Sequence, residues 1–323
     1  MATKSEKLYY RVGGHCYCVS SCNDDDVTGL LSSSEPFRLS DAPSDEEPLL
    51  FRLTLDDQWR PTQRGQKVFH SDHGDGFYDV FMLPDSSFLI DSISIDGQLC
   101  SQMQAVPDFS EAVVWLSDDK EKRTWCLNNT LMMLYAFSAA DQMTLLMHAS
   151  VVRKEGKGYL CLGKSGTGKS THTSNWLRYI PGTDLMNDDN PVVRVSADGV
   201  VRVYGSPWSG KTPCYRNVEA PVGAFLLLQQ APYNKIERLN VVNSLVAMIE
   251  SCSMMRWDKR EYSGVMDTLN AILSSVPLYQ MENLPNEEAV RMSCEVMTGH
   301  KPEQREQTET STSSPEENAK ENS

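Results

Sequence analysis

Basic residues and long apolar segments are both scarce in this sequence. Its 323 residues include 30 Lys and Arg against 44 Asp and Glu, so the formal net charge at pH 7 is −14. This acidic excess disfavours nucleic acid and anionic membranes as partners, because both carry negative charge. The longest strongly apolar run, residues 224–228, is far shorter than the roughly 20 residues of a membrane-spanning helix. No apolar core follows residues 1–6, so we expect no signal peptide.

The cysteines show no sign of pairing. There are nine of them, an odd number scattered along the chain, which is typical of reduced thiols and predicts a cytoplasmic protein. Cys16, Cys18 and Cys22 lie near His15, but no second Cys or His pair follows at the spacing of a zinc site. The simpler interpretation is that Cys16 and Cys18 share one face of a strand.

The pattern of apolar residues divides the chain into three parts. Residues 1–125 contain strand-like runs at 8–20, 49–55, 77–83 and 87–95, separated by polar turns, and we expect residues 70–73 to be a polar loop. Residues 126–299 begin within a mostly buried helix predicted at 124–140 and then alternate strands and helices. Residues 300–323 are almost free of apolar side chains and are predicted to be a disordered acidic tail. The expected fold class is α/β with a β-rich N-terminal region.

A phosphate-binding motif carries the strongest functional signal. Residues 163–170 match the P-loop pattern G-x-x-x-x-G-K-[ST] at every fixed position. The apolar run 158–162 precedes the motif as a strand should, and residues 170–179 can form a helix whose N-terminus points at the phosphates. Lys169 is expected to contact the β- and γ-phosphates, and Ser170 to ligate Mg²⁺. The predicted nucleotide-binding residues are Gly163, Lys164, Ser165, Gly166, Thr167, Gly168, Lys169, Ser170 and Thr171.

Two adjacent carboxylates follow the motif closely. Asp188 and Asp189 come 19 and 20 residues after Lys169, at the end of a short predicted strand. One of them can hold Mg²⁺ while the other accepts a proton from an incoming hydroxyl. The alternative is a solvated loop or a helix cap, which is common for such residues.

His148 precedes the motif in the apolar run 145–152. A strand there is expected to lie beside the P-loop strand, with residues 154–158 as the hairpin turn. This arrangement would bring His148 towards the phosphates, for metal binding or proton transfer. A hydrogen-bonded core histidine is the equal alternative.

These motifs together resemble the nucleotide-binding core shared by HPr kinase/phosphorylase and ATP-dependent phosphoenolpyruvate carboxykinase. The resemblance rests on Met147-His148-Ala149-Ser150, the loop 163–170 and the pair Asp188-Asp189, with weaker similarity to HPr kinase-like proteins at 276–281 and 286–291. It implies a mixed-sheet α/β P-loop core in which Lys169 contacts phosphate. It further implies that His148 and both aspartates form the catalytic and metal cluster. We assign the metal to Ser170 and Asp189, although the two families leave open which aspartate is the base.

A shaped loop stands where HPr kinases carry a Glu-Ile-Arg-Gly segment. Residues 205–210 have glycine at both ends and contain Pro207 and Trp208. Lys211 could neutralise the transferring phosphoryl group, with Arg216 assisting, because the strand at 200–204 is expected beside the Asp pair. The alternative is a surface turn with Trp208 packed as a lid on the core.

The sequence therefore predicts an ATP-dependent, Mg²⁺-requiring phosphotransferase with His148, Lys169, Asp188, Asp189 and Lys211 as catalytic residues. Its partners would be ATP and an unidentified phosphoacceptor, a Ser or Thr hydroxyl of a protein, a peptide or a small metabolite. Neither nucleic acid nor a membrane is expected to bind, and a homo-oligomer is possible. The alternatives are a carboxykinase-type enzyme and a non-catalytic ATP-binding sensor.

Overall fold

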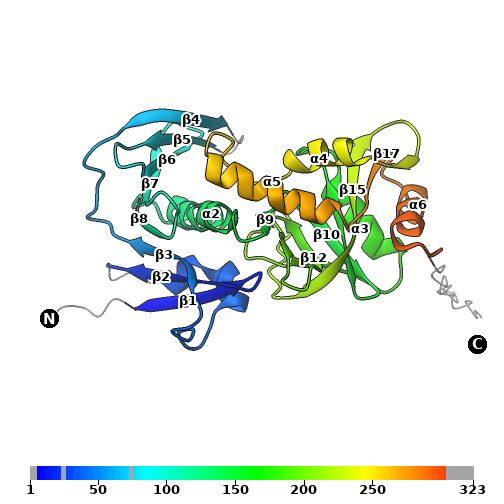
Figure 1. Ribbon diagram of the computed structural model, residues 1–323, viewed down its shortest axis with the longest axis horizontal. Helices are drawn as coiled ribbons and strands as arrows, with labels where there is room; N and C mark the ends of the chain where they lie inside the picture. The colour runs from blue at the N-terminus through cyan, green and yellow to red at the C-terminus, as the bar shows by residue number, and fades with distance from the viewer. Residues whose placement is uncertain (1–5, 23–26, 73–75, 303–323) are drawn as a thin grey trace, which may run out of the picture.

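The molecule has two lobes, each built on one β-sheet. The computed structural model describes residues 6–22, 27–72 and 76–302. In Figure 1 the two lobes lie side by side along the long axis, and helix α5 (Lys259–Leu273) reaches across both. Most of the tail predicted at 300–323 lies outside the described residues.

The N-terminal lobe is an eight-stranded sheet, which confirms the predicted β-rich region. Its strand order is β1-β2-β3-β8-β7-β6-β5-β4, with parallel pairing on both sides of β3 and antiparallel pairing elsewhere. The strands are β1 (Lys7–Val12), β2 (His15–Ser21), β3 (Leu49–Leu55), β4 (Gln66–Asp72), β5 (Gly76–Met82), β6 (Phe88–Ser94), β7 (Leu99–Ala105) and β8 (Glu111–Leu116).

Helix α2 (Lys120–Ala139) packs against this sheet. The side chain of Asp119 caps it by accepting hydrogen bonds from the backbone of Glu121 and Lys122. Its fully buried residues, such as Leu131 and Tyr135, join one apolar core with the sheet, with α1 (Val27–Leu30) and with the 3-10 turn η1 (Ser32–Phe37). The helix predicted at 124–140 is thus confirmed, and the boundary expected between residues 125 and 126 falls inside it.

The second lobe is a nine-stranded mixed sheet. Its main path is β12-β10-β11-β15-β14-β13-β9, and β17 joins β15 and β16. The long strand β15 pairs with β14 at its start and runs parallel to β11 and β17 further along. The strands are β9 (Thr144–Leu146), β10 (Ala149–Lys154), β11 (Lys157–Leu162), β12 (Thr183–Asp189), β13 (Val192–Val195), β14 (Val201–Tyr204), β15 (Glu219–Gln230), β16 (Lys235–Arg238) and β17 (Leu278–Asn283).

Alternating side chains of β11 build a core on each face of this sheet. Tyr159 and Cys161 join the apolar core shared with α3 (Lys169–Tyr179) and α6 (Glu287–Thr298). Leu160 and Leu162 join the core on the other face, beneath α4 (Val241–Ile249) and α5. The alternation follows from the period of two of a strand, and it confirms the α/β pattern expected for residues 145–297.

Three local expectations were wrong. The run 8–20 is a hairpin, because Gly13 and Gly14 take positive φ angles of 56° and 80° and reverse the chain. Residues 145–152 form two strands, β9 and β10. His70 and Ser71 belong to strand β4, although a polar loop was expected there; the rest of that predicted loop reaches residue 73, outside the described residues.

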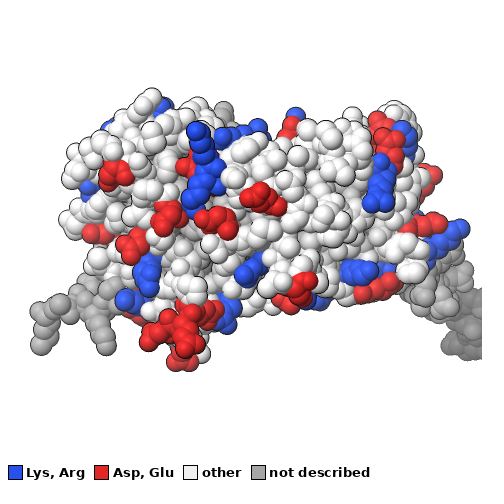
Figure 2. Space-filling model, viewed as in Figure 1, with Lys and Arg blue, Asp and Glu red and all other residues white. Residues whose placement is uncertain are grey.

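The surface mixes both signs of charge. On the face in Figure 2, the described Lys and Arg side chains lie in small groups among Asp and Glu and form no continuous band. Among the described residues, no helix combines the length and the apolar character needed to cross a membrane.

Candidate functional site

The glycine-rich loop connects β11 to α3, as predicted. Gly163, Gly166 and Gly168 have φ angles of 142°, 81° and 102°, which side-chain-bearing residues rarely adopt. At Gly163 an added Cβ would also lie 2.6 Å from Thr167 Oγ1. The loop conformation therefore requires these glycines, and it delivers the chain to the first turn of α3 at Lys169.

Lys169 is turned back into its own loop. Its Nζ donates to the carbonyl oxygens of Gly163 at 2.8 Å and Lys164 at 3.3 Å, and the residue is only 8% exposed. Burial lowers the pKa of this ammonium, while the nearby charges of Asp189 and Asp188 oppose that shift. The cation is thus held at the centre of the loop close to two carboxylates.

Ser170 contacts the first of those carboxylates. Its Oγ donates to Asp188 Oδ1 at 2.9 Å, and Asp188 is 3% exposed. One turn further along α3, the hydroxyls of Thr173 and Ser150 lie 2.8 Å apart. These two contacts fasten the start of α3 to β12 and β10, which pair with each other in the sheet.

His148 contacts the second carboxylate. Its Nε2 lies 3.2 Å from Asp189 Oδ1, and the two side chains are 41% and 38% exposed. His148 does not sit within a strand as expected: it lies at the break between β9 and β10, where its backbone N–H donates to Ser251 O. Asp189 has a φ of 139° and its Oδ2 accepts from Asn190 Nδ2. The pair faces solvent at the end of β12.

The loop 205–212 lies against the Asp pair through its backbone. Gly210 N donates to Asp188 O at 2.6 Å, and Ser209 Oγ donates to the same oxygen at 2.9 Å. Ser209 also forms an isolated antiparallel β-bridge with Asp189. The strand expected beside the pair, β14, lies instead between β13 and β15. Trp208 is buried against Tyr135, as the packed-lid alternative describes.

The two basic residues predicted near this loop differ in position. Lys211 follows Gly210 directly, and because Gly210 N donates to Asp188 O, the backbone of Lys211 lies close to the Asp pair. The Lys211 side chain is exposed. Arg216 does not reach the site. It forms an ion pair with Asp184 at 2.8 Å and contacts Leu185 O, towards the opposite end of β12.

Asn187 is a site residue that the sequence analysis missed. The residue is fully buried, and its Nδ2 donates to Ser206 and to Trp208 O while its Oδ1 accepts from Asn190 N. The sequence offered one signal for this role: Asn187 is an uncharged polar residue directly before two aspartates in a short strand.

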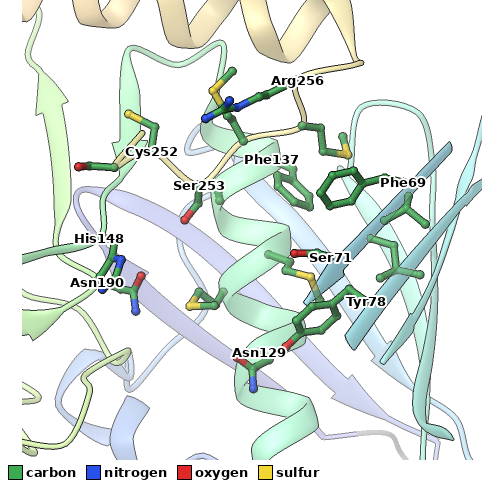
Figure 3. Close-up of a pocket in the computed structure, with 18 of the residues that line it drawn as sticks. Phe69, Ser71, Tyr78, Asn129, Phe137, His148, Asn190, Cys252, Ser253 and Arg256 are labelled. Atoms are coloured by element: carbon green, nitrogen blue, oxygen red, sulfur yellow. The ribbon is translucent and has the colours of Figure 1, made fainter. Parts of the chain in front are cut away.

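Two cavities flank the glycine-rich loop. The larger, of about 760 Å³, includes Ser165, His148 and Asp189 in its lining, with the N-terminal sheet and α2 on its far side. Figure 3 places His148 and Asn190 at one end of this cavity and Phe69, Ser71 and Tyr78 at the other. We call this space the acceptor-side cleft, after the phosphoacceptor that is expected from the sequence. The sequence analysis gave no indication of it.

The smaller cavity, of about 590 Å³, is lined by the following residues of the loop and by the ends of two strands. Gly166, Thr167, Gly168 and Thr171 form one wall. The opposite wall comes from residues that end or follow the parallel strands β15 and β17: Gln230, Ala231, Asn283, Leu284 and Pro285. Ligands of α/β proteins commonly bind at such carboxyl ends of strands.

The acidic groups do not make a closed metal cage. Across residues 6–22, 27–72 and 76–302, no group of three or more His, Cys, Asp or Glu side chains could hold a metal ion. Mg²⁺ in phosphotransfer sites takes only one or two protein carboxylates, with the remaining ligands from phosphates and water. The hydroxyl of Ser170 and the carboxylate of Asp188 are hard oxygen donors of the kind that this ion prefers.

Comparison with known proteins gives one family. A family model described as SynChlorMet cassette protein ScmC matches residues 114–275, which is half of the chain. The matched segment includes α2, the glycine-rich loop, both aspartates and His148. No curated protein matches the chain.

Proposed function

The chain belongs to the family of SynChlorMet cassette protein ScmC, and we propose that it is an ATP-dependent, Mg²⁺-requiring phosphotransferase. One observation carries the proposal. A glycine-rich loop contributes to the lining of two cavities, and a Ser170–Asp188 contact and a His148–Asp189 contact both lie beside it. This arrangement suits a nucleotide on one side and a phosphoacceptor on the other.

ATP would bind with its nucleoside in the smaller cavity and its phosphates along the loop. The backbone N–H groups of residues 163–171 and the N-terminus of α3 favour negative charge there. Lys169 would exchange the carbonyl oxygens of Gly163 and Lys164 for phosphate oxygens. The P-loop core of the HPr kinase and carboxykinase type, which the sequence resembles, belongs to this proposal.

Ser170 and Asp188 would hold Mg²⁺. The sequence analysis paired Ser170 with Asp189, but the hydrogen bond of Ser170 goes to Asp188, and we move the metal role accordingly. The bound ion would neutralise charge on the β- and γ-phosphates.

Asp189 would be the catalytic base. It would accept the proton of the acceptor hydroxyl as the hydroxyl oxygen bonds to the γ-phosphorus and ADP leaves. His148 would orient the Asp189 carboxylate through its Nε2 contact. Lys211 would offset negative charge on the transferring group.

A carboxykinase reaction fits this site poorly. A dicarboxylate substrate requires several cations, and among the described residues that line the acceptor-side cleft, Arg256 is the only Lys or Arg. The hydroxyl-acceptor reaction makes no such demand.

The test is to separate ATP binding from turnover with variants of Lys169 and Asp189. We expect Lys169→Ala to weaken ATP binding, measured by calorimetry in the presence of Mg²⁺. Asp189→Asn should keep ATP binding and slow transfer of labelled γ-phosphate by about 10²–10⁴-fold. The matched control is Asp184→Asn, on the same strand but paired with Arg153 and Arg216 away from the loop. A non-catalytic sensor would bind ATP yet show no Asp189-dependent turnover, and that result would refute the proposal.

A further inference from the structure

Five aromatic and four methionine side chains are among the 23 residues that line the acceptor-side cleft. Figure 3 shows Phe69 from the N-terminal sheet beside Phe137 of α2 and Tyr78 beside Asn129, with Cys252, Ser253 and Arg256 along another wall. The residues 250–257 form that wall, and Trp257 from it stacks on Phe69 with ring centroids 4.3 Å apart. The N-terminal sheet thereby lines the same cavity as His148 and Asp189.

Helix α2 presents a second apolar face to this cleft. The lining residues of α2 recur at helical spacing, and apart from Ala136, which is also buried in the core, they lie on a partly exposed face: Trp125, Asn129, Met132, Met133 and Phe137. Most of these side chains are only partly buried. A helix that is apolar on two faces, one of which lines a cavity beside the reactive pair, points to an apolar ligand there.

We propose that the phosphoacceptor is an extended peptide segment whose Ser or Thr lies close to aromatic or long aliphatic side chains. The inference rests on the proposed phosphotransferase function and names its substrate class. The acceptor hydroxyl would lie at Asp189 while the neighbouring apolar side chains occupy the cleft. The Ser or Thr oxygen would form the bond to the γ-phosphorus as the bond to the β,γ-bridging oxygen breaks, ADP leaves, and Asp189 takes the proton.

Three observations favour a peptide over a small polar metabolite. Four methionines line the cleft, and flexible methionines suit varied apolar side chains: Met132, Met133, Met254 and Met255. Among the described residues that line the cleft, the Asp, Glu, Lys and Arg side chains are Asp189, Glu250 and Arg256. A small polar metabolite would be recognised by more charges than these. Strand β4, which carries Phe69 of the lining, is the last strand in the order of the N-terminal sheet, and an edge strand is where an extended peptide can add to a sheet.

The experiment uses a degenerate library of short peptides with a central serine, incubated with the full chain, Mg²⁺ and γ-labelled ATP. We expect labelled peptides to be enriched roughly tenfold in Phe, Trp, Leu or Met within three positions of the serine. Enrichment in charged residues would overturn the inference. So would the absence of any labelled peptide from an enzyme that still hydrolyses ATP in an Asp189-dependent way.

Variants on the two faces of one sheet give the second readout. Phe69→Ala removes a partly exposed cleft side chain, and Phe77→Ala removes a ring that stacks on His70 on the other face. We expect Phe69→Ala and Met133→Gln to raise the KM for the selected peptide about tenfold while the KM for ATP stays unchanged. Phe77→Ala should behave as the unmodified protein. Equal changes in the peptide KM of Phe69→Ala and Phe77→Ala would refute the peptide site in the cleft. If the unmodified chain did not bind ATP at all, the proposed function itself would be refuted.

Discussion

Asn187 shows how one buried amide can hold a reactive site together. Its side chain joins the strand β12 to Ser206, to Trp208 O and to Asn190 N. Ser206 and Trp208 belong to the loop that contacts Asp188 and Asp189, and Asn190 follows the two aspartates directly. The positions of both carboxylates therefore depend on a residue that itself takes no part in the proposed chemistry.

We predict that Asn187→Ala lowers the free energy of unfolding by about 1–3 kcal/mol, because it leaves buried donors and acceptors without partners. Urea unfolding followed by circular dichroism measures the change. Asn217→Ala is the control, since the Asn217 side chain makes its hydrogen bond to Pro36 O at an exposed site, and it should change stability by less than about 0.5 kcal/mol. If both variants changed the free energy of unfolding by the same small amount, the buried hydrogen bonds of Asn187 would not be what stabilises this region.

At the scale of the element, the start of α5 fixes one wall of the acceptor-side cleft. Asp258 caps the helix by accepting from Glu261 N, and Glu261 Oε1 accepts from Met255 N at 2.7 Å. Glu261 is fully buried, and burial raises the pKa of its carboxyl to about 8, although the bond from Met255 opposes the shift. The loop at Met255 is thus held by a hydrogen bond to a carboxyl group that is protonated in the folded protein at neutral pH.

This protonation makes stability depend on pH. Below pH 4.5, the ordinary pKa of the group, Glu261 is protonated in both the folded and the unfolded chain. Between that value and about pH 8 only the unfolded chain loses the proton, so Glu261 lowers the free energy of unfolding by up to about 1.4 kcal/mol per pH unit. We predict that Glu261→Gln removes this decline and that its advantage over the unmodified protein grows from pH 5 to pH 8. Unfolding curves at each pH measure it, with the exposed Glu295→Gln as control; parallel pH profiles for all three proteins would disprove the assignment.

The local pattern of the sequence predicted the elements around the glycine-rich loop and missed the acceptor-side cleft. The strand, the loop and the helix from Lys157 to Tyr179 are encoded by adjacent residues, and so is the Asp pair. The cleft joins Phe69, Trp125 and Met254, which lie far apart along the chain and meet only through packing. The break at His148 is equally invisible locally, because it arises when Met147 N and His148 N donate to Pro191 O and Ser251 O instead of continuing one strand.

At the scale of the whole molecule, the two lobes share a core. Leu146 and Val192 belong to strands of the second sheet, yet they pack in the apolar core of the N-terminal lobe. Polar contacts add to this junction: Arg194 donates to Gly13 O at 3.1 Å, and His15 Nε2 lies 2.9 Å from Thr144 Oγ1. We therefore expect the two lobes to unfold together.

We predict a single unfolding transition, with coincident curves from tryptophan fluorescence and circular dichroism. Leu146→Ala should shift both curves together and cost roughly 2–5 kcal/mol, because it opens a cavity in the shared core. Leu99→Ala, at a site that is 38% exposed, is the control and should change little. Two separate transitions, or a shift confined to one probe, would show that the lobes unfold independently.

The backbone of Asp189 has a consequence for how this protein can change in evolution. Its φ of 139° lies in a region that glycine adopts readily. A residue with a side chain adopts this conformation at a conformational free-energy cost of about 1–3 kcal/mol. Selection for stability alone would favour glycine at this position, so under the proposed function the carboxylate is kept for its role as base. We expect a homologue without the proposed phosphotransfer activity to gain stability by carrying glycine at position 189.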